Sequence, residues 1–122
     1  MSTPVSDIKK AQKEKIIQRE VATLFMEAAQ DDPELAGIMV TRVELTPDKG
    51  MCYIYMYVDG GLATFKEKLK YLKLFKPSLR KSLADALKFR YTPDLTFAFD
   101  SQYEKEMEIN NLFETLKEKG EL

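Results

Sequence analysis

Four segments of the chain carry apolar residues at the three- and four-residue intervals of a helix face. The first predicts a helix over residues 9–30, capped by Ser6 and Asp7, with residues 1–8 expected to be frayed. Its apolar stripe comprises Ile17, Val21, Leu24, Phe25 and Ala28. The others predict helices over residues 62–74, 78–90 and 103–119. The stripe of the last, Ile109, Leu112, Phe113 and Leu116, predicts a helix that closes the domain.

Three further segments show the two-residue alternation of a half-buried strand. They are residues 38–45, 51–58 and 95–99. In the second, one face carries Cys52, Ile54, Met56 and Val58, and the other carries Tyr53, Tyr55 and Tyr57. We expect the aliphatic face to meet the helices, with Cys52 as an inert core residue. The tyrosine face should be the outer one, because each phenol hydroxyl needs water or a hydrogen-bonding partner.

Proline and glycine residues set the connections between these elements. Residues 46–50, Thr-Pro-Asp-Lys-Gly, predict a turn that joins the first two strands in a hairpin. Phe75-Lys76-Pro77 predicts a break between the second and third helices, because a proline removes a backbone donor and disfavours helix geometry before it. The expected order is α-β-β-α-α-β-α, with the third strand parallel to the first. This order predicts a single α+β domain over residues 1–122, in which helices cover one face of a three-stranded mixed sheet.

Composition narrows the classes of function. The 122 residues include no histidine and one cysteine, so the commonest general base and an internal disulfide are both missing. The carboxylates show no catalytic pairing, and no metal-ligand cluster or phosphate-binding loop is present in the sequence. We therefore expect no catalytic residue, no metal and no cofactor. No apolar run approaches the roughly 20 residues of a membrane span, and the first residues lack the apolar core of a signal peptide, so a cytoplasmic protein is expected.

The charge distribution changes this picture more than the net charge of −1 does. Residues 66–90 carry nine basic and two acidic residues, whereas the segments before and after them are net acidic. Such segregation is typical of a phosphate-binding face. The candidate RNA-binding residues are Lys66, Lys70, Lys73, Lys76, Arg80, Lys81, Lys88 and Arg90, with Lys68 in the same segment.

Four alternatives remain open at this point. The lysines could form a solvated face, or a surface that binds an acidic partner protein. Arg90 could instead pair with Asp100 as part of the fold. The tyrosines of the second strand could stack nucleic-acid bases, although aromatic residues also suit an ordinary outer sheet face.

Residues 79–100, LRKSLADALKFRYTPDLTFAFD, also carry a family resemblance. The pattern L-R-x-x-L-A-x-x-L-x-x-R-x-x-P-D-L-x-F-x-x-D resembles the signature of ribosome-binding factor A, a family of bacterial assembly proteins of the small ribosomal subunit. A second block fits the same family, namely Asp-Pro-Glu-Leu at residues 32–35 and Val-Glu-Leu-Thr-Pro-Asp at residues 43–48.

The resemblance implies a type II KH fold and a non-enzymatic, monomeric assembly factor. Its partners would be the free 30S subunit and 16S rRNA. It would act in late 30S maturation and in 16S precursor processing, especially in the cold. KH domains hold nucleic acid at a GxxG loop, but residues 74–77 read Leu-Phe-Lys-Pro here, so the usual grip is not expected.

Overall fold

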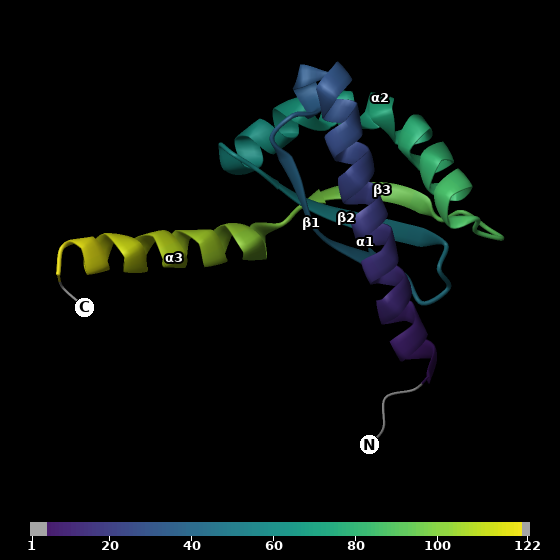
Figure 1. Ribbon diagram of the computed structural model, residues 1–122, viewed down its shortest axis with the longest axis horizontal. Helices are drawn as coiled ribbons and strands as arrows, with labels where there is room; N and C mark the ends of the chain where they lie inside the picture. Colours follow the sequence, from purple (N-terminus) through teal and green to yellow (C-terminus); the bar gives the residue numbers. More distant parts are fainter. Residues whose placement is uncertain (1–4, 121–122) are drawn as a thin grey trace.

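The computed structural model describes residues 5–120, which form a three-stranded sheet, three long helices and a short 3-10 turn, η1 (Pro33–Leu35). Helices α1 (Val5–Asp31) and α2 (Gly61–Leu87) pack on one face of the sheet, and α3 (Ser101–Glu118) extends away from it (Figure 1). The α+β architecture that the sequence predicts is confirmed. Ser6 and Asp7 lie inside α1 rather than at its cap, and residues 1–4 of the segment expected to be frayed fall outside the described residues.

The sheet has the order β1-β2-β3. Strands β1 (Ile38–Leu45) and β2 (Met51–Val58) form the predicted antiparallel hairpin, and β3 (Asp94–Phe99) pairs with β2 in parallel. The prediction that the third strand runs parallel to the first is therefore wrong. A single helical crossover returns the chain to the starting end of β2, and a strand that follows such a crossover runs parallel to the strand before it.

Helix α2 also differs from the prediction. It is continuous over 27 residues with Pro77 in its interior, so the expected break at Phe75-Lys76-Pro77 is a bend within one helix (Figure 1). A proline inside a helix removes one hydrogen bond and bends the axis, but packing on both sides can keep the helix intact. Here Leu72 and Leu79, on either side of the bend, are fully buried. The two arms occupy the places of the two predicted helices, so the order α-β-β-α-α-β-α is retained.

The predicted orientation of β2 is confirmed. The exposed fractions of Cys52, Ile54 and Met56 are zero, and Val58 is buried beside them. The core is completed by residues of both packed helices, including Ile17, Val21 and Phe25 of α1 and Phe65, Leu72, Leu79 and Leu83 of α2. In contrast, Tyr53 is exposed, and Tyr55 and Tyr57 are half-buried on the other face.

A β-bulge at Thr41 changes the phase of β1. Val40 pairs with Met56 and Arg42 with Tyr55, so Thr41 is the extra residue. Without a bulge, residues 40 and 42 would share a face; with it, Val40 and Val43 face the core and Arg42 faces outward. The bulge therefore places two neighbouring polar side chains on the outer side of the sheet.

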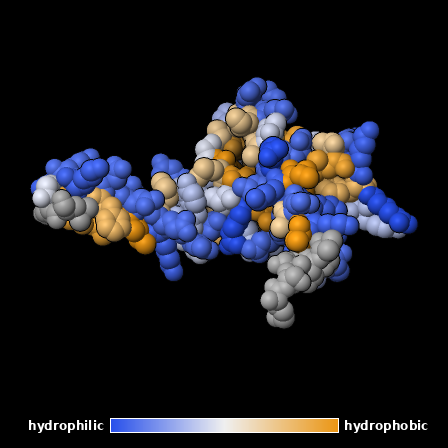
Figure 2. Space-filling model, turned by 60° about the horizontal axis from the view of Figure 1, so that its bottom comes forward, coloured by the Kyte–Doolittle hydropathy of each residue, from blue (hydrophilic) through white to orange (hydrophobic). Residues whose placement is uncertain are grey.

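The closing helix does not close the domain. Ile109, Leu112 and Phe113 are 52%, 59% and 54% exposed, and Figure 2 shows hydrophobic side chains on the outer part of α3. The expectation that this stripe packs on the domain is wrong, because α3 leaves the end of β3 and points away from both packed helices (Figure 1).

Candidate nucleic-acid interface

The predicted basic residues follow α2 along the side that faces away from the core. Four lysines of α2 are spaced so that they share a helix face. They are Lys66, Lys70, Lys73 and Lys81, at successive intervals of four, three and eight residues. All four are exposed. Within residues 5–120, none of them has a carboxylate oxygen within 4.0 Å. The structure thus brings these four cations onto one accessible side of the helix.

Two other members of the predicted set take part in the fold. Arg80 donates from Nε to the carbonyl of Pro93 at 3.1 Å and from Nη2 to the carbonyl of Thr92 at 2.8 Å. Lys76 is half-buried, and its Nζ lies 3.8 Å from Asp94 Oδ1. Both contacts join the bent part of α2 to the loop that precedes β3. These two charges therefore help to hold that loop in place.

Lys68 lies on a different side of α2. Its ammonium donates to the carbonyl of Glu34 at 2.9 Å and lies 3.7 Å from the carboxylate of the same residue. Lys68 therefore connects α2 to η1 and does not belong to the exposed row.

The last two members lie beyond the end of the helix. The sequence predicts a helix that continues to Arg90, but α2 ends at Leu87, and Lys88 forms its C-cap in the left-handed conformation. Arg90 is exposed, and its guanidinium carbon lies 5.4 Å from the centroid of the Tyr91 ring. It does not pair with Asp100, so that alternative is wrong.

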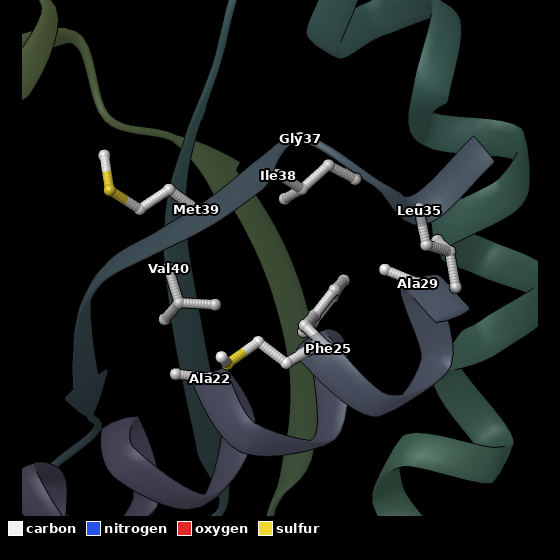
Figure 3. A pocket seen from close by; sticks show the side chains of 9 residues that line it. Ala22, Phe25, Ala29, Leu35, Gly37, Ile38, Met39 and Val40 are labelled. Carbon is white, nitrogen blue, oxygen red and sulfur yellow. The ribbon is translucent and has the colours of Figure 1, made fainter. Parts of the chain in front are cut away.

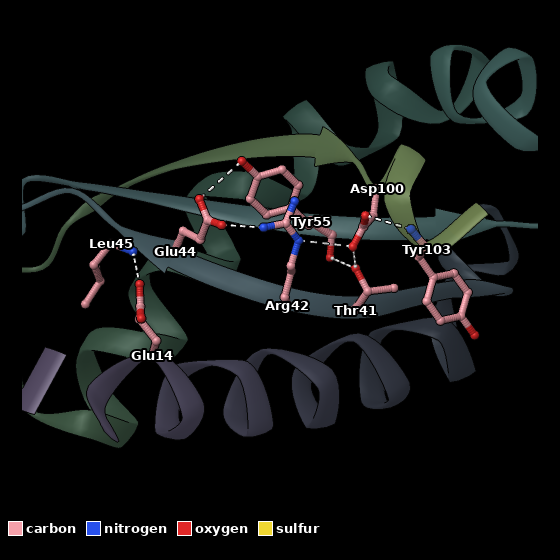
Figure 4. A network of polar contacts seen from close by, with 8 residues as sticks. All are labelled: Glu14, Thr41, Arg42, Glu44, Leu45, Tyr55, Asp100 and Tyr103. Carbon is pink, nitrogen blue, oxygen red and sulfur yellow. Dashed lines mark hydrogen bonds and ion pairs between the residues drawn. The ribbon is translucent and has the colours of Figure 1, made fainter. Parts of the chain in front are cut away.

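Asp100 is held instead by the bulged strand β1 (Figure 4). Its Oδ2 accepts hydrogen bonds from the Thr41 hydroxyl at 2.6 Å and from Arg42 Nε at 3.3 Å. Its Oδ1 accepts from the Tyr103 N–H at 3.0 Å, which caps α3. Burial opposes ionisation of this carboxyl, but the hydrogen bonds and the Arg42 charge outweigh it and lower its pKa.

The tyrosines of β2 are mostly engaged with neighbours. The Arg42 guanidinium stacks 3.8 Å from the Tyr55 ring centroid, and the Tyr55 hydroxyl donates to Glu44 at 3.4 Å. Burial, together with the Glu44 carboxylate, raises the pKa of Tyr55. The Tyr57 ring packs 5.2 Å from the Tyr103 ring of α3. These contacts describe an ordinary outer sheet face rather than a platform of free rings.

Other features of the described residues offer little chemistry. A hollow of about 320 Å³ between α1 and β1 is lined by apolar side chains and Gly37 (Figure 3), so it offers no charge to a phosphate. Burial raises the pKa of the Cys52 thiol to about 12, with a smaller contribution from Glu14, as expected of an inert cysteine. Residues 5–120 hold no group of three His, Cys, Asp or Glu side chains suited to a metal. None of their helices is long and apolar enough to cross a membrane.

Comparison with known proteins identifies the family of this chain. The family model for ribosome-binding factor A matches residues 9–113. The chain belongs to the ribosome-binding factor A family. It is 32% identical over 104 residues to ribosome-binding factor A of Clostridium novyi (strain NT), covering 84% of this chain and 85% of that protein. The corresponding protein of Clostridium acetobutylicum is 29% identical over 101 residues, covering 83% and 84%.

Solved structures agree with this assignment. The crystal structure of ribosome-binding factor A from Thermus thermophilus superposes with a TM-score of 0.62 at 26% identity. The match covers 73% of this chain and 93% of that chain. The KH-like fold expected from the resemblance is thereby confirmed for this member of the ribosome-binding factor A family.

The signature residues of the ribosome-binding factor A family have identifiable structural roles in this chain. Leu79, Leu83 and Leu95 are fully buried, and the contact of Arg80 with the Pro93 carbonyl joins the two halves of the motif. In place of a GxxG loop, the bend of α2 carries Leu74, which is 80% exposed. The motif therefore builds the joint between α2 and β3, while the lysines around it supply the charge.

Sequence reasoning missed Lys13. Its ammonium lies 4.6 Å from the centroid of the Phe89 ring, which brings α1 against the loop that follows α2. The signal was the run of lysines at positions 9, 10, 13 and 15, a pattern that is equally typical of a solvated first part of a helix.

Proposed function

We propose that this protein is a non-enzymatic ribosome assembly factor that binds the free 30S subunit through its 16S rRNA. The observation that carries the proposal is the exposed row of Lys66, Lys70, Lys73 and Lys81 on α2. Membership of the ribosome-binding factor A family supports a ribosomal partner for that row.

The chemistry of the row suits the backbone of structured RNA. Ammonium groups on flexible stems can follow phosphates without reading base edges, and each contact releases condensed counterions. A rigid two-layer domain that presents such a row can favour one arrangement of rRNA over others by binding energy alone. We propose that the protein acts in this way as a monomer in the cytoplasm, late in 30S maturation and during 16S precursor processing, with most effect in the cold.

The test reverses charges on the row without disturbing the fold. Lys73 and Lys81 are suitable because both are exposed, whereas Lys76 is paired with Asp94 and Arg80 holds the loop at Pro93. The double variant Lys73→Glu/Lys81→Glu should bind purified 30S subunits more than about tenfold more weakly at moderate salt. Its log–log salt slope should be shallower by about two, one for each lost phosphate contact.

The control reverses two charges on a different helix. Glu114→Lys/Glu118→Lys alters exposed residues of α3, in the acidic part of the chain, and should not weaken binding. Equal binding by the parent and Lys73→Glu/Lys81→Glu would show that the row is only a solvated face. Binding that survives ribonuclease treatment of the subunit preparation would instead favour an acidic protein partner.

A further inference from the structure

A hollow of about 310 Å³ lies where α1 passes the C-terminal end of α2, apart from the row on the middle of α2. Its lining combines apolar side chains, chiefly Ile16, Ile17 and Phe89, with the cations Lys13, Lys88 and Arg90. Among the described residues, no acidic side chain lines it. The nearby Glu14 points to the sheet, where it accepts a hydrogen bond from the Leu45 N–H at 2.7 Å (Figure 4).

Two contacts between a cation and an aromatic ring lie in the hollow or directly beside it. The Lys13 ammonium lies 4.6 Å from the Phe89 ring centroid, and Arg90 lies 5.4 Å from the ring of Tyr91. Tyr91 is 77% exposed, which is unusual for a ring of its size in a folded domain. Rings and guanidinium planes are the surfaces on which unpaired RNA bases stack, and ammonium groups are suited to the phosphates that flank them.

The backbone of Lys88 adds an independent observation. Its φ is 51°, in the left-handed region where glycine is preferred, at the position that caps the C-terminus of α2. In the described part of the chain, the non-glycine residues with positive φ are Lys88 and Lys49, and Lys49 lies in the β1–β2 turn. At position 88 the strained residue is a cation on the wall of the hollow, and strained backbone is often retained at binding sites.

We propose that this hollow binds one unstacked nucleotide of the rRNA, such as a bulged residue. Its base would stack on Phe89 and the Arg90–Tyr91 pair, and its phosphates would contact Lys13 and Lys88. The inference rests on the proposed function, because it supposes that the partner is RNA. It adds a second point of contact, which selects RNA by an unpaired base rather than by charge alone.

The experiment compares two probes, an RNA hairpin with a single bulged nucleotide and the same hairpin fully paired. The full-length protein should bind the bulged hairpin at least about fivefold more tightly, which corresponds to the lower end of the free energy of one base–aromatic stack. Lys88→Gly should reduce this preference by at least about half while leaving the thermal unfolding midpoint unchanged or higher, because glycine suits the left-handed backbone.

The chain offers matched controls for both kinds of contact. Lys49→Gly removes the same charge from a residue that also has a positive φ, in the hairpin turn and outside the lining of the hollow, and should leave the preference intact. Tyr91→Ala should reduce the preference, whereas Tyr53→Ala, which removes an exposed ring from the sheet face, should not.

The outcomes separate this inference from the proposed function. If the protein binds subunits but binds both hairpins equally, or neither, the inference is overturned while the function of the α2 row stands. The inference also falls if the bulged hairpin is preferred but neither Lys88→Gly nor Tyr91→Ala changes that preference. Failure of the protein to bind subunits would overturn the proposed function itself.

Discussion

Arg42 Nε lies 3.3 Å from Asp100 Oδ2, so the carboxylate that caps α3 is held by the bulged strand β1. The two residues are 58 positions apart in the chain. Asp100 is 3% exposed, and its second oxygen accepts from the first turn of α3. One buried carboxylate therefore connects the sheet to the helix that projects from it.

Replacing this carboxylate should destabilise the protein in a pH-dependent way. Asp100→Asn should lower the free energy of unfolding at pH 7 by about 1–3 kcal/mol, because it leaves buried donors with a weaker acceptor. The folded-state pKa of Asp100 is lowered. The Asp100 carboxylate therefore makes its whole contribution to the free energy of unfolding at pH values well above the unfolded pKa of 3.8. This contribution declines as the pH falls below that value, and it is lost once the pH falls through the folded pKa.

The measurement is denaturant unfolding of the parent and Asp100→Asn at pH 7 and at several values below pH 4. The difference between the two proteins should narrow as the pH falls. Asp85→Asn, at an exposed position of α2, should differ little from the parent at any of these values. A difference for Asp100→Asn that is independent of pH would contradict the ionic part of this argument.

The two faces of β2 should respond differently to truncation. Ile54 is fully buried between the sheet and the packed helices, so Ile54→Ala should leave a cavity and cost about 2–5 kcal/mol. Tyr55 lies on the outer face against Arg42, so Tyr55→Ala should cost less and leave the fold intact. Denaturation midpoints of the two variants test this, and a reversed order would mean that the sheet packs through its other face.

A pair of leucines tests whether α3 is unpacked. Leu83 is 1% exposed on α2, whereas Leu112 is 59% exposed on α3. Leu83→Ala should cost about 2–5 kcal/mol, and Leu112→Ala should change the free energy of unfolding by no more than about 0.5 kcal/mol. Similar losses for both variants, measured by denaturant unfolding at low protein concentration, would show that the α3 stripe is buried in solution.

Local sequence patterns determined which elements form and which faces are buried. The alternation of Cys52, Ile54 and Met56 with three tyrosines was sufficient to orient β2, because successive side chains of a strand point to opposite sides. The helical spacing of Ile17, Val21 and Phe25 was sufficient to identify the buried side of α1. The clustering of basic residues between positions 66 and 90 likewise indicates the candidate interface from the sequence alone, since charge is a property of composition.

Only the tertiary structure decided how these elements are joined and which charges are free. Pro77 predicts a disturbance, but whether it breaks or bends the helix depends on the packing of Leu72 and Leu79 on either side, and the direction of β3 is set by its pairing with β2. Arg80 binds the Pro93 carbonyl, and Asp100 binds Arg42. These contacts join residues of different elements, so the local periodicity of the sequence cannot predict them. The sequence thus determines the local elements through the spacing of apolar residues, whereas long-range contacts determine their directions and the partners of individual charges.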